Sequence, residues 1–197
     1  GGFIVPAATA NGEVVVNGMS PSKRNNEFAN SGIVVEINIE KDIPKYNQFG
    51  VLKGLEFQKS LEKLAFNAGG RSQVAPAQRL TDFVEGKLSP NLNSTSYQPG
   101  LKSAPLHSLL PKIIGGRLRK GFEAFGRKMN GFYTEEANVI GVESRTSSPV
   151  NIPRNENLAH PEVEGLYPCG EGGGYAGGII SAAMDGERCD EAAIENL

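Results

Sequence analysis

Residues 165–177 have the sequence GLYPCGEGGGYAG, and this stretch carries the strongest structural pattern in the chain. It predicts a short strand over 165–169, a tight glycine loop, and a helix of small residues over 176–184 that ends near Asp185-Gly186. Residues 172–177 match the spacing G-x-G-x-x-G, which is found where a strand leads through a loop into a helix beside a nucleotide. The stretch therefore predicts a strand–loop–helix edge that a ligand can approach closely.

The glycine spacing alone does not define a complete nucleotide-binding unit. Such a unit needs a second strand after the helix, with an acidic residue near its end that binds the ribose. Only about 20 residues follow Gly177, and we expect 189–197 to form a final helical piece rather than a strand. A complete unit of this kind is therefore disfavoured. A loop and a helix N-terminus still present backbone N–H groups and the positive end of a helix dipole, which suit an electron-rich oxygen.

A flavin fits an edge of this kind. Its C2 oxygen is electron-rich, and reduction places negative charge nearby, so a helix N-terminus aimed at that side would stabilise the reduced form. Glu171 can accept hydrogen bonds from ribityl hydroxyls, and glycines at 172–174 let the backbone lie against the ring. Tyr175 either packs beside the ring or donates a proton. The alternative for the loop is a plain strand-to-helix turn without a ligand.

The composition excludes several classes of protein. The chain has 197 residues, 39% hydrophobic content, a formal net charge of −2 and 25 glycines that follow no period. These values exclude collagen-like structure and give no reason to expect a nucleic-acid or membrane partner. Without a signal peptide or an apolar run of about 18 residues, we expect a cytoplasmic protein.

The two cysteines are too few for a disulfide framework, and no metal-ligand spacing exists. Cys169 adjoins the glycine loop, where a thiol can pair with a second thiol in redox chemistry. Cys189, however, lies beyond the predicted helix, and the chain has no C-x-x-C motif. We therefore expect Cys169 to be a buried structural residue.

The rest of the chain has a mixed pattern that predicts an α+β fold, a mixed β-sheet with helices. Asn11-Gly12 indicates a hairpin, and the β-branched run at 32–39 is the strongest strand signal. The predicted strands are 3–8, 13–17, 32–39, 138–143 and 150–152, and the predicted helices are 55–67, 80–88, 106–110 and 112–125.

Three polar residues are candidates for binding a substrate. The run RTSS at 145–148 follows a predicted strand and combines a cation with three hydroxyls, which suits a carboxylate or phosphate. Arg24 lies in a polar, asparagine-rich loop. We take Arg24, Arg145 and Ser147 as the candidates. In each case the alternative is a solvated polar turn.

Residues 112–128 are rich in Lys and Arg, with two interleaved phenylalanines. Helices that bind nucleic acid or a membrane surface share this pattern. The net charge of −2 and the lack of a second basic patch favour a solvated helix face instead.

Three stretches resemble the C-terminal part of an uncharacterised bacterial family of FAD-dependent dehydrogenases, also described as FAD-utilizing oxidoreductases. The first is the glycine stretch itself, continued through Gly178-Ile179. The second is VNGMS at 16–20 with Arg24 and ANS at 29–31, and the third is ESRTSSPV at 143–150. The resemblance spans nearly the whole chain. Gly173 departs from it, because the family more often has Ala at that position.

The resemblance implies a flavoprotein whose N-terminal dinucleotide-binding domain, absent from this chain, holds the ADP part of FAD. It implies that residues 3–152 form a substrate or cap-type domain and that residues 153–197 complete the FAD-binding domain. The implied reaction is hydride transfer between an unknown small-molecule substrate and FAD. The cofactor-binding residues that it implies are Gly170, Glu171, Gly172, Gly173, Gly174, Tyr175, Ala176 and Gly177.

Because most of the contact surface for FAD lies in the missing domain, we expect the isolated chain to be inactive and to retain little or no FAD. The alternative is a non-catalytic structural or interaction domain in which the glycine loop is a plain turn. An upstream strand followed by its own G-x-G-x-x-G and a distant acid would favour the enzyme.

Overall fold

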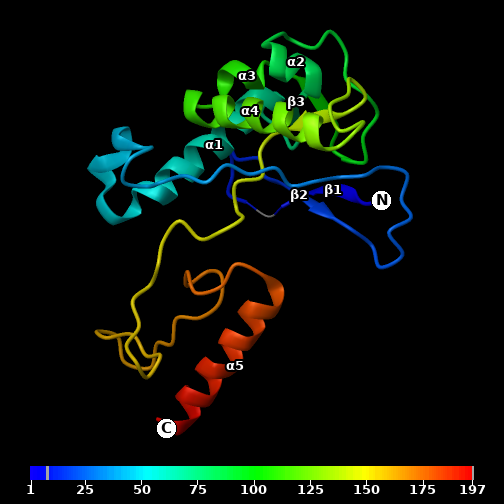
Figure 1. Ribbon diagram of the computed structural model, residues 1–197. Helices are drawn as coiled ribbons and strands as arrows, with labels where there is room; N and C mark the ends of the chain where they lie inside the picture. Colours follow the sequence, from blue (N-terminus) through cyan, green and yellow to red (C-terminus); the bar gives the residue numbers. More distant parts are fainter. Residues whose placement is uncertain (8, 197) are drawn as a thin grey trace. The chain divides into compact units, whose positions relative to one another are not determined.

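The computed structural model describes residues 1–7 and 9–196 and has the predicted α+β fold (Figure 1). The chain forms two compact units. The first unit comprises Gly1–Asp42 and Lys59–Ser144, and the second comprises Ile43–Gln58 and Arg145–Leu197. The assignment of 3–152 to a substrate domain and 153–197 to an FAD-binding domain stays a prediction.

The first unit begins with an antiparallel hairpin. Strand β1 (Phe3–Pro6) pairs with β2 (Val16–Met19), with Phe3 opposite Met19 and Pro6 opposite Val16. The hairpin was expected, but its second strand starts at Val16 rather than at residue 13. Residues 13–15 are instead drawn into the interior, where Val14 and Val15 are 0% and 2% exposed. The end of the predicted first strand, Ala8, lies outside the described residues.

A three-stranded sheet forms the centre of the first unit. Strand β3 (Ala75–Arg79) lies between β4 (Leu101–Ser103), which runs parallel to it, and β5 (Asn138–Ile140), which runs antiparallel. Only β5 was expected, and it ends at Ile140 rather than at residue 143. The sequence of β3, APAQR, has low strand propensity, yet its first four residues are buried. Pairing and burial therefore determine this strand where local preference does not.

The helices lie close to their predicted ranges. Helix α1 (Lys53–Gly69) ends at the Gly69-Gly70 pair, and α2 (Leu80–Glu85) ends at Gly86, whose φ of 73° caps the helix in the left-handed region. Helices α3 (Leu106–Leu109) and α4 (Lys112–Lys128) follow as expected. A 3-10 helix, η1 (Pro44–Leu52), was not expected.

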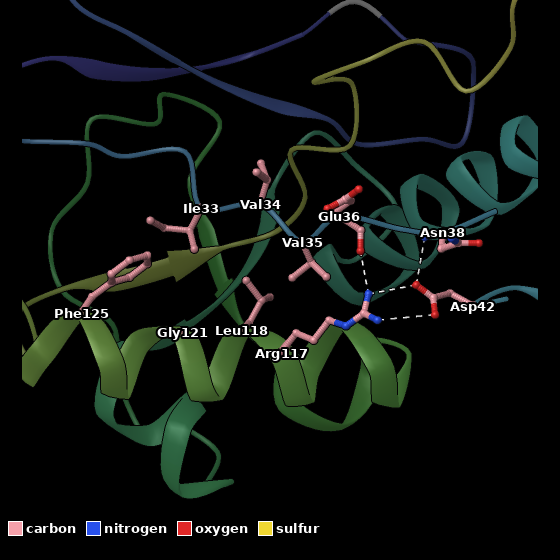
Figure 2. A pocket seen from close by; sticks show the side chains of 10 residues that line it. All are labelled: Ile33, Val34, Val35, Glu36, Asn38, Asp42, Arg117, Leu118, Gly121 and Phe125. Carbon is pink, nitrogen blue, oxygen red and sulfur yellow. Dashed lines mark hydrogen bonds and ion pairs between the residues drawn. The ribbon is translucent and has the colours of Figure 1, made fainter. Parts of the chain in front are cut away.

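The strongest predicted strand, 32–39, is wrong. The segment is described throughout, but it is not assigned as a strand. Its residues alternate between half-buried and exposed positions, and Figure 2 shows Val35 pointing toward α4 while Val34 points away. Every second side chain of this segment is therefore partly buried on the side that faces α4. Such alternating burial is typical of a strand, but it does not require a neighbouring strand.

The segment 32–42 and helix α4 border a groove of about 530 Å³ in the first unit (Figure 2). Arg117 donates to the Glu36 carbonyl at 2.6 Å and to Asp42 Oδ2 at 2.9 Å. Arg117, one of the basic residues of 112–128, thus binds the segment 32–42 of its own chain. This is compatible with the prediction that α4 has a solvated face.

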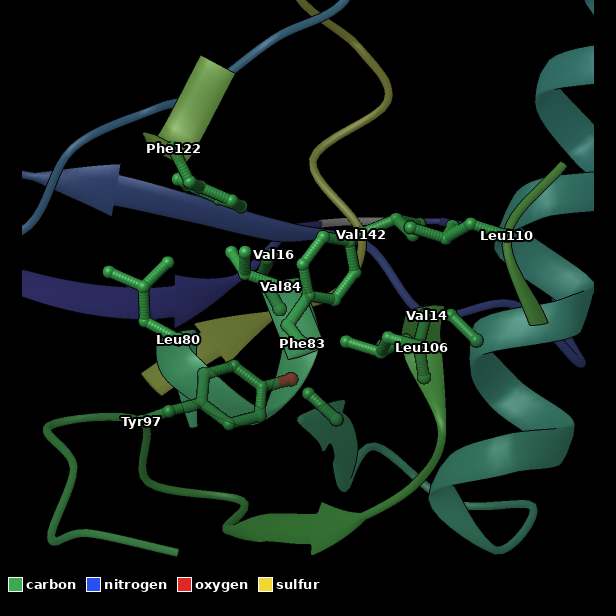
Figure 3. Packing of buried hydrophobic residues seen from close by; sticks show 12 residues of the cluster. Val14, Val16, Leu80, Phe83, Val84, Tyr97, Leu106, Leu110, Phe122 and Val142 are labelled. Carbon is green, nitrogen blue, oxygen red and sulfur yellow. The ribbon is translucent and has the colours of Figure 1, made fainter. Parts of the chain in front are cut away.

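The core of the first unit combines the hairpin, the central sheet and helices α1 to α4 (Figure 3). Phe83 is fully buried and meets Phe122 edge to face, with ring centroids 5.7 Å apart. The Tyr97 ring is also buried, and its hydroxyl donates to the Gln73 carbonyl at 2.7 Å. The buried cluster comprises Val14, Val16, Ala65, Ala75, Leu80, Phe83, Val84, Tyr97, Leu106, Leu110, Phe122 and Val142.

Replacing Phe83 by Ala tests this core. We expect a loss of about 3–5 kcal/mol in the free energy of unfolding, because the substitution removes a buried ring and leaves a cavity beside Phe122. Leu88→Ala is the control, since Leu88 is 57% exposed and should change stability by less than about 0.5 kcal/mol. Urea denaturation followed by circular dichroism measures both. Equal losses for the two variants would contradict the assigned core.

Candidate functional site

The second unit contains the glycine loop and one long helix, α5 (Ile179–Glu195). The predicted helix over 176–184 and the separate piece from residue 189 are wrong, because α5 is continuous through Asp185-Gly186. A glycine inside a helix costs about 1 kcal/mol, but the adjacent Asp185 is buried and bonded, which holds the helix together here. The stretches 165–169 and 150–152 are described and are not strands, and Leu197 lies outside the described residues.

The glycine loop is closed by its own backbone. Gly174 N–H donates to the Glu171 carbonyl at 3.0 Å, and Tyr175 N–H donates to the Gly170 carbonyl at 3.0 Å. The preceding segment also binds the loop, since Ile152 N–H donates to the Gly173 carbonyl at 3.1 Å. The loop therefore has a defined shape without a ligand.

Two glycines are required by that shape, and a third fits it closely. Gly170 and Gly174 have φ angles of 65° and 85°, which favour glycine, and a Cβ on Gly174 would lie 2.6 Å from the Val150 carbonyl oxygen. A Cβ on Gly173 would lie 3.0 Å from the Cys169 carbonyl oxygen. A family preference for Ala at this position would thus require a small shift of the loop.

Two other glycines are not required by the fold. At Gly172 and Gly177 an added Cβ would meet no atom of residues 1–7 or 9–196 within 4 Å, and neither residue has a positive φ. Side chains would fit at both positions in the folded chain. Because glycine has no side chain, the space over the backbone at these two positions is open. A flat ligand ring needs such space to approach the backbone closely.

A run of backbone N–H groups follows the loop. In the described part of the chain, the N–H groups of Ala176, Gly177 and Gly178 have no hydrogen-bond acceptor. The first turn of α5 adds the N–H groups of 179–181, since its first internal bond is from Ala182 N–H to the Gly178 carbonyl. Because α5 begins at Ile179, Ala176 belongs to the approach to the helix and not to the helix itself.

A buried ion pair anchors the loop to α5. Arg154 Nη2 lies 2.8 Å from Asp185 Oδ1, and Arg154 Nη1 lies 3.0 Å from Oδ2, with the two side chains 11% and 8% exposed. Asp185 Oδ2 also accepts the Gly170 N–H at 2.9 Å, while Arg154 donates to the Pro168 carbonyl at 3.0 Å. Both partners of the ion pair therefore also hydrogen-bond to the backbone at the start of the loop, at Pro168 and Gly170.

The electrostatics of the pair follow from these bonds. The hydrogen bond from Arg154, followed by that from the Gly170 N–H, holds the pKa of Asp185 below its ordinary value. The same bond to Asp185 raises the pKa of Arg154. Both groups are therefore charged at neutral pH, and each offsets the cost of removing the other from water.

Tyr175 completes the anchor. The Arg154 guanidinium carbon lies 3.6 Å from the centroid of the Tyr175 ring, a cation–π contact. The Tyr175 hydroxyl donates to the Ile152 carbonyl at 2.7 Å. Of the two roles considered for Tyr175, these contacts favour packing over proton donation.

The other candidates lie away from these contacts or on open surface. Arg24 belongs to the first unit, is exposed and has a φ of 49°. Arg145 and Ser147 are exposed in the second unit, just before the turn in which the Ser148 hydroxyl donates to the Val150 carbonyl at 2.7 Å. Glu171 is also exposed, as its proposed role with ribityl hydroxyls requires. These roles stay predictions.

Arg154 and Asp185 were missed in the sequence. They are separated by 31 positions, and neither belongs to a recognisable spacing. Asp185 was taken only as part of a helix end. No local pattern identifies a pair whose partners are brought together by a loop that folds back on a helix.

Comparison with known proteins finds a matching family model and a longer relative. A family model described as "FAD-dependent protein, C-terminal domain-like" matches residues 1–146. An uncharacterized protein of Clostridium beijerinckii (strain ATCC 51743 / NCIMB 8052) is 41% identical over 199 residues, which cover 100% of this chain and 37% of that protein. The chain thus spans little more than a third of the relative's length. The family model ends before the glycine loop, whereas the similarity to the relative extends through it.

No helix in the described part of the chain is long and apolar enough to cross a membrane.

Replacing Asp185 by Asn tests the anchor. The variant leaves Arg154 without its counter-charge, so we expect a loss of about 2 kcal/mol, between the values for exposed and fully buried pairs. Faster hydrogen exchange of the Gly170 N–H should accompany it. Glu85→Gln is the control, because the Lys87–Glu85 pair is exposed and should add almost nothing.

The effect should depend on pH with a defined sign. The pKa of Asp185 is lowered in the folded chain, so its contribution is present above its unfolded pKa of about 3.9 and is lost as pH falls through the lower folded value. Calorimetric unfolding should therefore separate wild type from Asp185→Asn at neutral pH and bring them together in acid. A difference that grows in acid would contradict the ion pair.

Proposed function

The chain belongs to the FAD-dependent protein C-terminal domain-like family, and on this premise we propose that it completes the flavin site of a larger FAD-dependent dehydrogenase. In this proposal the second unit contributes the loop that faces the flavin. Residues 3–152 are proposed to form the substrate or cap-type domain. FAD supplies the hydride-accepting ring when bound, and the substrate is a small molecule of unknown identity.

The open glycines carry this proposal. Gly172 and Gly177 have space that the fold does not use, and Gly177 lies within the run of unpaired N–H groups. A ring placed over the open space would bring its electron-rich oxygen toward those N–H groups and toward the positive end of α5. No conformational change of the loop is needed for this, because its own hydrogen bonds already hold its shape.

The residues of this chain would act by orientation and electrostatics. One or more of the N–H groups of 176–181 would donate to a flavin oxygen, and the others would add to the positive potential that stabilises negative charge there. Glu171 would accept from ribityl hydroxyls, and Gly172 would let the backbone approach the ring. Arg145 and Ser147 are proposed to bind an anionic group of the substrate, and Arg24 is proposed as a further contact.

The remainder of the flavin site is proposed to lie in an N-terminal dinucleotide-binding domain. The relative is much longer than this chain, which leaves room for such a domain. The N-terminal half of α5 carries Ile179, Ile180 and Met184 at exposures of 89%, 72% and 59%. Three large apolar side chains on one short surface are costly in water, and we propose that the other domain covers them.

A plain structural turn is the second candidate. It is favoured by Gly170, Gly173 and Gly174, each of which the loop geometry explains without a ligand. The two candidates differ at Gly172 and Gly177, because the loop geometry gives no reason for glycine at those positions, whereas a closely approaching ligand would.

Valine substitutions at Gly172 and Gly177 in the full-length protein separate the two candidates. We expect the dissociation constant for FAD to rise by at least about tenfold, or about 1.4 kcal/mol, because a branched side chain fills the space over the backbone. Gly116→Val is the matched control, since Gly116 in α4 also has no atom within 4 Å of an added Cβ. Flavin fluorescence titration measures all three. Wild-type affinity in both loop variants would favour the plain turn.

The isolated chain should purify without bound flavin. Most of the contact surface for FAD is proposed to lie in the N-terminal dinucleotide-binding domain, so the absorbance of oxidised flavin at about 450 nm should be absent. Full-length protein, tested anaerobically against a panel of hydride donors, should show bleaching of its flavin. A yellow isolated chain with stoichiometric flavin would show that the site is complete without the other domain.

A further inference from the structure

The structure places the Cys189 thiol beside the backbone that leads into Cys169, although the two cysteines are 20 positions apart in the sequence. The Cys189 thiol lies 3.9 Å from the Pro168 carbonyl oxygen, directly before Cys169. Directly after Cys169, Gly170 N–H donates to Asp185, which is one helical turn before Cys189 on α5. Cys169 is therefore flanked on both sides by contacts to the helix face that carries Cys189.

This arrangement corrects the expectation that Cys169 is a buried structural residue. Cys169 is exposed, and Cys189 is the buried one. The reason is that α5 is continuous and folds back along the loop, so its second half lies beside the start of the loop rather than beyond it.

We propose that Cys169 and Cys189 form a reversible dithiol–disulfide site that reacts with small-molecule disulfides. Neither the family description nor the relative assigns such a site. The proposal is independent of flavin binding, because both thiols and all of their contacts lie in the second unit.

The two thiols are suited to different steps. Cys169 is accessible to an incoming disulfide, whereas Cys189 is 3% exposed and shielded from direct attack. Burial raises the pKa of the Cys189 thiol, and the negative charge of Asp185 and the Cys169 thiol add to the increase. Arg154 Nη1 lies 3.3 Å from Cys189 Sγ, and its positive charge lowers the pKa of that thiol. The guanidinium can therefore stabilise the Cys189 thiolate when it forms.

The exchange takes place in two steps. The Cys169 thiolate attacks one sulfur of a disulfide RSSR, forming a Cys169–S–S–R mixed disulfide and releasing RS⁻, which takes up a proton. The Cys189 thiol loses its proton to solvent, and its thiolate attacks Cys169 Sγ, which releases the second RS⁻. The protein loses two electrons and two protons, and RSSR becomes two RSH.

The product would join the start of the glycine loop covalently to α5. The Arg154–Asp185 pair already links Pro168 and Gly170 to the same helix, so the disulfide would close where the two segments already meet. The redox state would then set how far the loop can separate from α5. The N–H groups of 176–181 lie between Cys169 and Cys189 in the chain, so the disulfide would close a loop that contains them.

Equilibration of the 197-residue chain with glutathione tests the site. The chain is held at a series of ratios of reduced to oxidised glutathione, quenched in acid, alkylated and examined by intact mass and peptide mapping. We expect a Cys169–Cys189 disulfide, seen as the loss of two hydrogen atoms. It should form in the folded chain at a ratio at least about tenfold more reducing than in urea, because folding holds the thiols together.

Single substitutions define the order of the steps. Cys189→Ser should stop at a glutathione adduct on Cys169, and Cys169→Ser should resist modification while folded. The comparison of folded and urea-treated wild type needs no variant, so it decides the question even if a substitution disturbs folding. A stable glutathione adduct on Cys169 of the folded wild type would overturn the proposal, as would a folded chain no easier to oxidise than the denatured one.

Discussion

The ion pair between Arg154 and Asp185 is the interaction on which the glycine loop depends. Each partner also bonds the loop backbone, Arg154 at the Pro168 carbonyl and Asp185 at the Gly170 N–H. Two charges with little exposure to water stabilise a fold only when they satisfy each other and their remaining bonds. This pair does so by using those remaining bonds to hold the loop. Arg154 also contacts the Tyr175 ring and the Cys189 thiol, so the pair connects the loop, Tyr175 and Cys189.

The glycines of the loop divide into two groups with different physical causes. Gly170 and Gly174 are needed for the turn because of their positive φ angles, and Gly173 fits it closely, since an added side chain would require a small shift of the backbone. Gly172 and Gly177 are not needed for it. Residue types that the local structure does not require are expected at functional sites, where binding or catalysis determines the residue instead of the fold. This division gives the flavin proposal a basis within the chain itself, in the region that follows the family match at 1–146.

The sequence predicted the elements whose structure is determined by neighbouring residues in the chain. Helix α1 was predicted from apolar periodicity and from the Gly69-Gly70 stop, and the β1–β2 hairpin from Asn11-Gly12. Strand β3 was missed because APAQR becomes a strand only through its neighbours and its burial. The segment 32–39 was misjudged for the converse reason, because its β-branched residues cover a helix without joining a sheet.

The candidate site was predicted in part for the same reason. The loop was visible in the sequence as a run of glycines, but its anchor was not, because Arg154 and Asp185 meet only in three dimensions. The continuity of α5 was missed because Gly186 suggests a break, and the position of Cys189 was missed with it. Long-range contacts of this kind leave no spacing that a single sequence can reveal.

The central claim is that the loop and the start of α5 face the flavin in the complete protein. Hydrogen exchange of the full-length protein, measured with and without FAD, tests it most directly. The account predicts that the N–H groups of 176–181 exchange at least about tenfold more slowly when FAD is bound, because they then donate to the ligand, while the end of α5 near Glu195 is unchanged. Protection confined to other parts of the protein, with 176–181 unaffected, would contradict it.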